Sequence, residues 1–262
     1  MNVLFVGYGQ MGSAMGKAWH MAGLVQNLYA VDPHLPLDAT AQAVPDPEAF
    51  DAALDVIVLA VKPAMAGSAL ASLPKRLLND CVIISVAAGV TLATLREAID
   101  DACPVVRVMP NTPMLLGAGC TGLYAGNDLP EAKRQVITQL FEAVGSAHWV
   151  QREPQLDAVT AISGSGPAYY HLFSEALAAA GEALGLDPEL ARRLAVDTAF
   201  GAATQQRQPQ ADLVQLRRAI TSPNGTTAAA IGVFERDQAL RALVQSAARA
   251  AAQRAEALSR GE

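Results

Sequence analysis

Two rhythms of hydrophobic residues divide this chain. Up to about residue 150, short runs rich in Val, Ile and Leu alternate with amphipathic stretches. The runs expected to form strands are Val3–Val6, Leu28–Val31, Asp55–Val61, Cys81–Val86, Val105–Met109, Thr121–Tyr124 and His148–Val150. Most are continuously apolar, which is typical of strands buried on both faces of a parallel sheet. The pattern predicts an α/β fold with a Rossmann-like doubly wound sheet.

From about Leu156 onward, the pattern predicts helices alone. The expected helices are Pro167–Leu184, Pro188 to about Gln205, Ala211–Ile220, one after Gly225, and Gln238–Ser259, with Asp187 and Asp237 as N-caps. Ala-rich helices bury little area each, so we expect this all-α half to pair with a second chain; the alternative is an intramolecular bundle. The predicted domains are residues 1–152 and 153–262.

Composition and charge narrow the function classes. The net charge is −6 without a long run of Lys or Arg, which argues against a nucleic-acid-binding protein. No segment is long and apolar enough to predict a membrane span, and the N-terminus lacks the features of a signal peptide. Three cysteines without a CxxC pair predict a reduced, cytoplasmic protein, and scattered histidines predict no structural zinc or other metal. Because the net negative charge would repel an anionic substrate, local dipoles would have to bind it.

A glycine motif follows the first predicted strand. Gly7, Gly9 and Gly12 form G-x-G-x-x-G at the start of a predicted helix. The first glycine permits a tight turn, the second lets a pyrophosphate approach the backbone, and the third allows close packing of helix and strand. The setting predicts a dinucleotide site, with a ligand-free glycine turn as the alternative.

Residues at other strand ends extend this predicted site. Asp32 ends the second strand, where a carboxylate would bind the ribose hydroxyls of NADH and repel the 2′-phosphate of NADPH. Its alternative role is to cap the turn before Pro33. Lys62 ends the next strand and either approaches the cofactor or substrate or lies in a solvated loop.

Two further loops face the same edge of the predicted sheet. Ala87-Ala88-Gly89 would form a wall where backbone approaches the nicotinamide closely. Asn111, in the segment RVMPNTP, would bind the ligand or its own backbone.

Five motifs together resemble a known family. AVKP, AAGVT, RVMPNTP, DAVTAISGSGPAYY and ITSPNGTTAAAIGVFE, in this order, are similar to segments of pyrroline-5-carboxylate reductases over nearly the whole chain, and the last two are the specific ones. The resemblance implies an oxidoreductase that transfers a hydride from NADPH or NADH to L-1-pyrroline-5-carboxylate, the last step of proline biosynthesis. It also implies a homodimer that swaps helical domains, with higher oligomers such as a decamer left open.

The resemblance also assigns roles to residues. It implies that Gly7, Gln10 and Met11 contact the pyrophosphate, and that the nicotinamide side is formed by Val61, Lys62, Pro63, Ala87, Ala88 and Gly89. It implies that the substrate carboxylate is held by Ser222, Gly225, Thr226 and Thr227. Glu153 matches a position near bound substrate analogues.

The chain departs from the family pattern at three places. Asn224 replaces the first glycine of the usual Gly-Gly pair, and Asn tolerates the left-handed conformation better than most residues. Arg218-Ala219 replaces a common Asp-Gln or Asp-Asn, so a substrate-side amide is absent. Val31-Asp32 stands where many members have small hydroxyl residues that accept NADPH, so the cofactor preference leans towards NADH.

The predicted chemistry needs one hydride and one proton. The helix that opens after Ser222 offers free N–H groups to the substrate carboxylate, and the Ser222 hydroxyl can add a hydrogen bond. The resemblance makes Thr227 the candidate proton donor. Because the imine nitrogen can be protonated before binding, Thr227 can instead orient the iminium, relay a proton from water, or serve only as a helix N-cap.

Other functions remain as alternatives. A hydroxyacid dehydrogenase on this scaffold needs a Lys or His on the first long helix, yet His171 is the only such residue between Pro167 and Gln206. A reductase for another imine, such as a six-membered cyclic ketimine, stays open because one methylene gives only ~1–3 kcal/mol of discrimination. A nucleotide sensor without catalysis would not need the segment SPNGTT.

Overall fold

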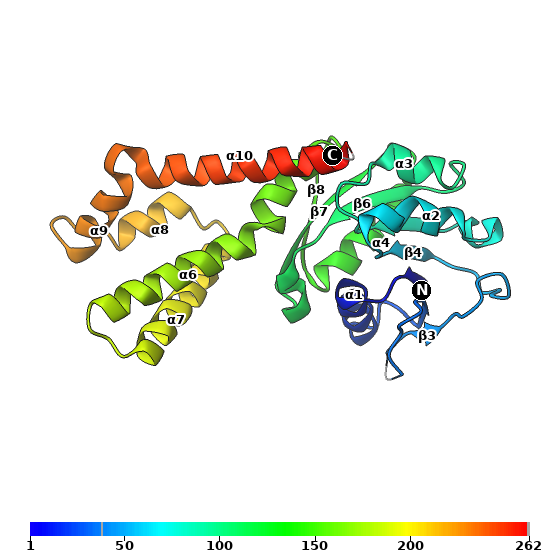
Figure 1. Cartoon of the computed structure of the whole chain (residues 1–262), viewed down its shortest axis with the longest axis horizontal. Helices are drawn as coiled ribbons and strands as arrows, with labels where there is room; N and C mark the ends of the chain where they lie inside the picture. Colours follow the sequence, from blue (N-terminus) through cyan, green and yellow to red (C-terminus); the bar gives the residue numbers. More distant parts are fainter. Residues whose placement is uncertain (38, 261–262) are drawn as a thin grey trace. The chain divides into compact units, whose positions relative to one another are not determined.

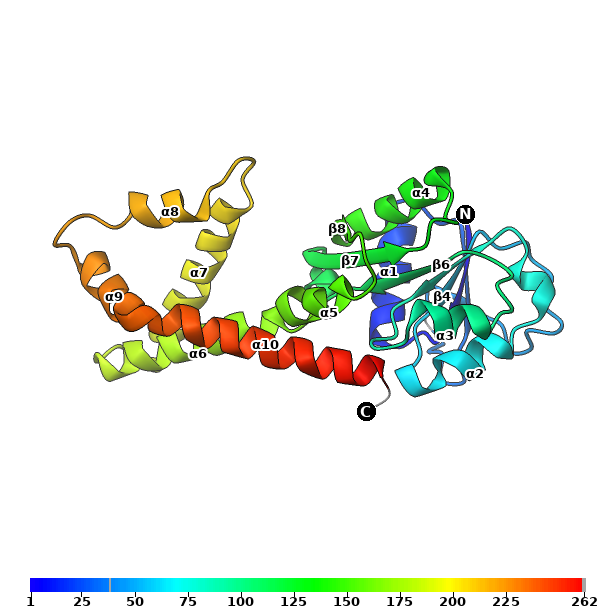
Figure 2. The same cartoon turned by 90° about the horizontal axis from the view of Figure 1, so that it is seen from above.

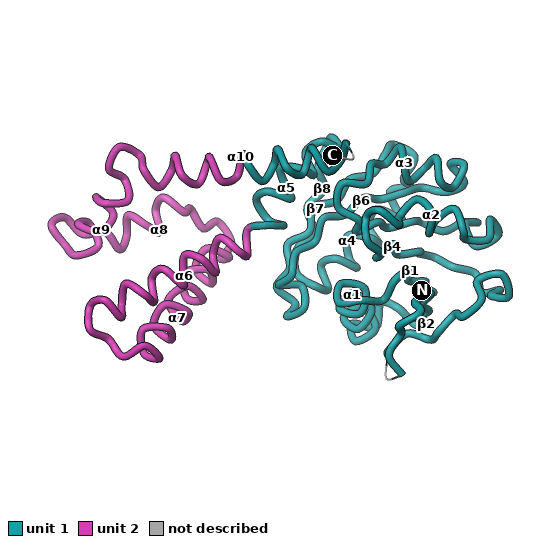
Figure 3. The backbone as a smooth tube through the Cα atoms, viewed as in Figure 1, with its two compact units in different colours: residues 1–165, 250–262 teal, residues 166–249 magenta. Residues whose placement is uncertain are grey.

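The computed structural model describes residues 1–37 and 39–260 (Figure 1). Contacts within the chain divide it into two compact units (Figure 3). The first unit comprises residues 1–165 and 250–262, and the second comprises residues 166–249. This division lies 13 residues beyond the expected domain boundary at 152/153, because the two short helical segments after residue 154 pack with the first unit.

Within the described residues, the first unit contains an eight-stranded sheet in the order β3-β2-β1-β4-β5-β6-β7-β8. The strands are β1 (Asn2–Val6), β2 (Asn27–Val31), β3 (Gln42–Ala43), β4 (Val56–Leu59), β5 (Val82–Ser85), β6 (Val105–Met109), β7 (Gly119–Ala125) and β8 (Gly145–Trp149). All neighbours pair in parallel except β6 and β7, which are antiparallel. β2 and β4 flank β1 on opposite sides, so the chain reverses its direction of winding there. The carboxyl ends of β1 and β4 therefore border the crevice where ligands bind in such sheets.

Helices cover both faces of the sheet, as a doubly wound fold requires (Figure 2). They are α1 (Gln10–Met21), α2 (Ala66–Ala71), α3 (Leu92–Glu97) and α4 (Glu131–Glu142), with short 3₁₀ helices η1 (Pro63–Met65), η2 (Lys75–Leu78) and η3 (Thr112–Leu116). One core lies under α1 and α4, where Trp19 stacks edge-on against Phe141 with ring centroids 5.8 Å apart. The other lies under α2 and α3 around Leu70 and Leu95. The predicted α/β fold is confirmed.

The remaining helices follow β8. They are α5 (Gln155–Val159), a π-helical turn η4 (Thr160–Gly164), α6 (Gly166–Ala183), α7 (Pro188–Gln206), α8 (Leu213–Ala219), α9 (Thr226–Glu235), η5 (Arg236–Gln238) and α10 (Ala239–Ser259). Asp187 caps α7 as predicted, accepting the backbone N–H groups of Glu189 at 3.1 Å and Leu190 at 3.2 Å. The predicted cap at Asp237 is wrong: this residue lies in η5 with φ 53°, and α10 starts two residues later.

The second unit is almost without a core of its own. Its described residues that are buried are the small ones Gly166, Ala191 and Ala195. Large apolar side chains such as Leu184 and Phe200 are exposed, at 86% and 75%. An aqueous monomer rarely leaves so many large side chains uncovered. No helix in the described part of the chain is long and apolar enough to cross a membrane.

Candidate functional site

The turn after β1 has the geometry that a dinucleotide motif requires. Gly7 has φ +87° and donates its N–H to the Val31 carbonyl at 3.0 Å. A Cβ at Gly7 would lie 2.7 Å from the Ala60 carbonyl oxygen, and one at Gly12 would lie 2.9 Å from the Gly7 oxygen. A Cβ at Gly9 would meet nothing within 4 Å. The first and third glycines therefore allow tight packing, while the second leaves open space above the backbone.

The first turn of α1 adds free donors to this open space. Gly9 is the N-cap residue and offers no side chain, and the first helical hydrogen bond runs from the Ser13 N–H to the Gly9 carbonyl at 2.9 Å. Gln10 is exposed and Met11 half-buried at the same end. Unpaired N–H groups at a helix N-terminus attract anions, so this turn can receive a pyrophosphate.

Asp32 fastens the glycine turn to the end of β2. Its Oδ2 accepts the Tyr8 N–H at 2.6 Å, and its Oδ1 accepts the His34 N–H at 2.8 Å. The second bond is the turn-capping role given as the alternative. Because each carboxylate oxygen has further lone pairs, the half-buried side chain can also accept ribose hydroxyls.

The chain after β4 carries the next predicted cofactor residues. Val61 is half-buried, whereas Lys62 and Pro63 are exposed. Lys62 is the N-cap residue of η1, and Pro63 is the first residue of that helix. The residues therefore lie at the carboxyl edge of the sheet, and the exposed Lys62 side chain fits both of its interpretations.

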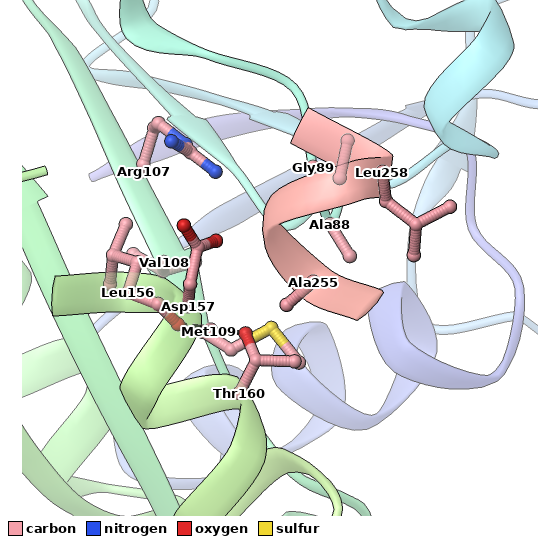
Figure 4. Close-up of a pocket in the computed structure, with 11 residues that line it drawn as sticks. Ala88, Gly89, Arg107, Val108, Met109, Leu156, Asp157, Thr160, Ala255 and Leu258 are labelled. Atoms are coloured by element: carbon pink, nitrogen blue, oxygen red, sulfur yellow. Dashed lines mark hydrogen bonds between the residues drawn. The ribbon is translucent and has the colours of Figure 1, made fainter. Parts of the chain in front are cut away.

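The loop between β5 and α3 packs against the end of α10. Gly89 has φ +77°, and a Cβ there would lie 3.1 Å from the backbone carbon of Leu258. A cavity of ≈ 30 Å³, room for about one water molecule, lies beside this loop. Figure 4 shows Ala255 and Leu258 of α10 close to Ala88 and Gly89 in its wall. The loop, the end of β6 and the last turns of α10 therefore line this cavity together.

A buried ion pair borders the same cavity. Oε1 of Glu153 accepts both Nη1 of Arg107, at 2.6 Å, and the Leu92 N–H, at 2.6 Å. The two side chains are 9% and 25% exposed for Arg107 and Glu153. Arg107 has no predicted role, although an arginine within the otherwise apolar run VVRVM indicates a buried charge that needs a partner.

Asn111 is occupied by the protein itself. Its amide nitrogen donates to the Ser163 carbonyl at 2.9 Å, and its side-chain oxygen accepts the Cys120 N–H at 2.8 Å. The side chain is buried, so it joins the end of β6 to the start of β7 and to η4. Its alternative role was a hydrogen bond to its own backbone; the structure instead pairs it with backbone groups 9 and 52 residues away.

The segment before α9 forms a second constellation, in the second unit. Asn224 has φ 59°, which confirms its predicted left-handed conformation. The Gly225 N–H donates to the Ser222 carbonyl at 3.1 Å, and a Cβ at Gly225 would lie 2.6 Å from Ser222 Oγ. Gly225 is the N-cap of α9 and no side chain caps this helix, so among the described residues the N–H groups of Thr226 and Thr227 have no hydrogen-bond partner.

Thr227 is the second residue of α9, so its alternative role as the N-cap is wrong. The side chain is half-buried, and among the described residues its hydroxyl has no hydrogen-bond partner. The predicted cofactor residues thus belong to the first unit, whereas the predicted carboxylate-binding residues belong to the second.

Both halves of the chain match families of known proteins. Residues 153–258 match the family described as pyrroline-5-carboxylate reductase dimerisation, and residues 2–89 match the family described as NADP oxidoreductase, coenzyme F420-dependent. The chain is 44% identical to the pyrroline-5-carboxylate reductase of Pseudomonas aeruginosa, over 85% of this chain and 79% of that one. It is 36% identical to the enzyme of the same name from Vibrio alginolyticus, over 99% and 98% of the two chains.

Solved structures give the same result. The pyrroline-5-carboxylate reductase of Coxiella burnetii superposes with a TM-score of 0.92 at 36% identity, covering 98% of both chains. The pyrroline carboxylate reductase of Plasmodium falciparum, solved with NADP bound, superposes with a TM-score of 0.85 at 31% identity, covering 99% of this chain and 98% of that one.

Proposed function

This chain belongs to the pyrroline-5-carboxylate reductase family, and from that premise we infer that it reduces L-1-pyrroline-5-carboxylate to L-proline with a hydride from a nicotinamide cofactor. The observation that carries this inference is the 44% identity to a reductase of that name over most of both chains. The reaction is the last step of proline biosynthesis, and we propose the cytoplasm as its location.

The residues of the first unit fit a dinucleotide. The open space at Gly9 and the uncapped start of α1 support pyrophosphate binding by Gly7, Gly9, Gln10, Met11 and Gly12. Asp32 would bind the adenosine ribose. The nicotinamide, which supplies the hydride when bound, would lie against Val61, Lys62, Pro63, Ala87 and Ala88. Asn111 would contribute by fixing the backbone of this edge.

NADH is proposed as a cofactor at least as good as NADPH. The Asp32 carboxylate would repel a 2′-phosphate, and its two backbone hydrogen bonds hold it at the end of β2. The Plasmodium relative has NADP bound, so both cofactors belong in the assay.

The start of α9 would hold the substrate carboxylate. Unpaired N–H groups of Thr226 and Thr227 and the hydroxyl of Ser222 supply donors, and Gly225 keeps the backbone accessible. This local arrangement offsets the repulsion that a net charge of −6 would exert on an anionic substrate.

Thr227 is proposed to orient the protonated imine or to relay a proton to its nitrogen. Its hydroxyl has no partner among the described residues, so it is available to substrate or water. We predict that Thr227→Ala lowers kcat about 10²-fold, the usual size of an acid–base contribution, while Thr227→Ser stays near wild type. Thr204→Ala on α7 is a matched control. If Thr227→Ala kept the wild-type kcat across pH and changed KM alone, no proton-transfer role would remain.

The activity itself is tested by following oxidation of NADH and of NADPH with and without L-1-pyrroline-5-carboxylate, beside a six-membered cyclic imine acid. We expect faster turnover of the five-membered ring. Equal or better turnover of the larger ring would support the alternative, a related ketimine reductase. Substrate-independent oxidation alone would end the enzyme interpretation.

A homodimer is proposed through the second unit. The match of residues 153–258 to a dimerisation family and the exposed apolar side chains of α6, α7 and α10 support it. Higher oligomers such as a decamer would build on this dimer.

A further inference from the structure

We propose that Glu153 is a positioning residue for the nicotinamide, acting through the loop of residues 87–89 rather than by touching the substrate. This rests on the proposed function in one respect, that the loop contacts the nicotinamide. Glu153 lies two residues before the start of α5, and its Oε1 is the shared acceptor of Arg107 and of the Leu92 N–H.

The loop is fixed at its entry by the sheet. Ser85 is the last residue of β5, and it pairs in register with Arg107 of β6. The Ser85 hydroxyl oxygen then accepts the Ala87 N–H at 3.3 Å. The pairing of β5 with β6 therefore fixes the backbone position of the first residues of the loop.

The exit of the loop is fixed by Glu153. Leu92 is the first residue of α3 and follows the loop by three positions, and its N–H has no partner within a helix that begins there. Glu153 supplies that partner at 2.6 Å. The left-handed residue Gly89 lies between the two fixed ends, with Leu258 behind it.

Arg107 makes this arrangement rigid. A nearly buried guanidinium needs an acceptor, because an unpaired charge out of water is costly. The same Glu153 oxygen that accepts its hydrogen bond also accepts the Leu92 N–H, so β6, α3 and the segment before α5 are linked at a single atom. Removal of the carboxylate would free the loop exit and leave Arg107 without its counter-ion.

The experiment compares binding of the whole cofactor with binding of its adenosine diphosphate ribose part. Binding of NADH and of ADP-ribose, which lacks the nicotinamide, is measured by calorimetry for wild type, Glu153→Gln and Glu153→Asp. The control is Glu48→Gln, which removes an exposed carboxylate that pairs with Arg76 in the same unit. Circular dichroism and thermal unfolding establish that each variant is folded.

We expect Glu153→Gln to weaken NADH about tenfold and to lower kcat by about ten- to a hundredfold, since a misplacement of 1 Å can cost that much. ADP-ribose should bind as in wild type, because its ligands lie at the glycine turn and Asp32. Glu153→Asp keeps the charge, so its NADH affinity and kcat should lie between those of wild type and Glu153→Gln. The control Glu48→Gln should have the NADH affinity and kcat of wild type.

Two results would overturn the proposal. Equal weakening of NADH and ADP-ribose would make Glu153 a general structural residue. A rise in KM for the imine with unchanged NADH binding would make it a substrate contact, as its match to the family implies. Because the binding comparison uses no imine, it stays decisive even if the proposed activity fails. If Glu153→Gln does not fold, the same comparison with Glu153→Asp decides.

Discussion

At the scale of single residues, Asp32 has a structural and a predicted electrostatic role at once. Its carboxylate ties the glycine turn to the turn after β2 through Tyr8 and His34. A negative charge at this place would raise the free energy of a bound 2′-phosphate, whereas it can accept hydrogen bonds from the free ribose hydroxyls of NADH. We therefore expect substitution to change both the stability of the turn and the choice of cofactor.

We predict that Asp32→Ser raises the ratio of kcat/KM for NADPH over NADH by about tenfold, equivalent to about 1.4 kcal/mol. The lost hydrogen bonds to a charged group should also lower the free energy of unfolding by about 1.5–3 kcal/mol. The control is Asp55→Ser, since Asp55 accepts the Asn2 N–H at 2.7 Å before β4 and should affect stability alone. An unchanged cofactor ratio in Asp32→Ser would remove the electrostatic role and leave the turn-capping one.

The sequence predicted the role of a residue where that role depends only on its neighbours along the chain. The three glycines and the left-handed Asn224 were predictable because a turn and a helix start constrain a few consecutive residues. The pairing of Arg107 with Glu153, 46 residues away, depends on how strands align. No motif or regular spacing of residues in the sequence indicated this ion pair.

At the scale of elements, β5 and β6 begin beside one another with a pair of buried thiols. Cys81 precedes β5 and Cys103 precedes β6, and their sulfur atoms lie 3.7 Å apart. The hydrogen bond to Cys103 and burial both raise the pKa of Cys81, although Lys133 opposes this, and the same hydrogen bond lowers the pKa of Cys103. In the folded protein Cys81 therefore keeps its proton at a pH where the unfolded chain has lost it.

The raised pKa makes the sheet less stable in alkali. Below the unfolded-state thiol pKa of about 8.5 the contribution of Cys81 is fully present, and above it unfolding releases a proton. We predict that the free energy of unfolding of wild type falls more steeply than that of the double variant Cys81→Ala/Cys103→Ala, which has neither thiol, by up to about 1.4 kcal/mol per pH unit above that point. Urea unfolding at several pH values measures this, with the half-buried Cys120→Ala as control. Parallel profiles for wild type and the double variant would contradict this prediction.

Elements with a strong periodic signal were the most predictable ones. The run of β6, apolar except for Arg107, was expected at Val105–Met109 and is found there. The two-residue β3 is exposed and carries no apolar run, so it had no signal. The π-helical turn η4 and the packing of α5 on the first unit arise from tertiary contacts, which is why the compact units divide later than the expected boundary.

At the scale of the whole molecule, the two units differ in how much apolar surface they bury, and this difference supports the proposed dimer. The first unit has a core on each face of its sheet, whereas the buried residues of the described second unit are one glycine and two alanines. Hydrophobic burial is the main favourable term in folding, so helices that bury so little cannot stabilise one another sufficiently. We therefore propose that a second chain covers their exposed Leu, Val and Phe side chains.

We predict that the protein sediments at twice its chain mass of 27.3 kDa, or at a higher even multiple, and that its unfolding temperature rises with concentration. Leu172→Asp with Phe200→Asp should weaken self-association by about 10²-fold or more, because each such side chain is worth about 1.5–3 kcal/mol when buried. The control is Leu37→Asp, the same change at an exposed leucine of the first unit. Sedimentation at the mass of one chain at every concentration would contradict the dimer. In that case, the second unit would have to cover its apolar faces within its own chain, and the double variant would leave the mass unchanged.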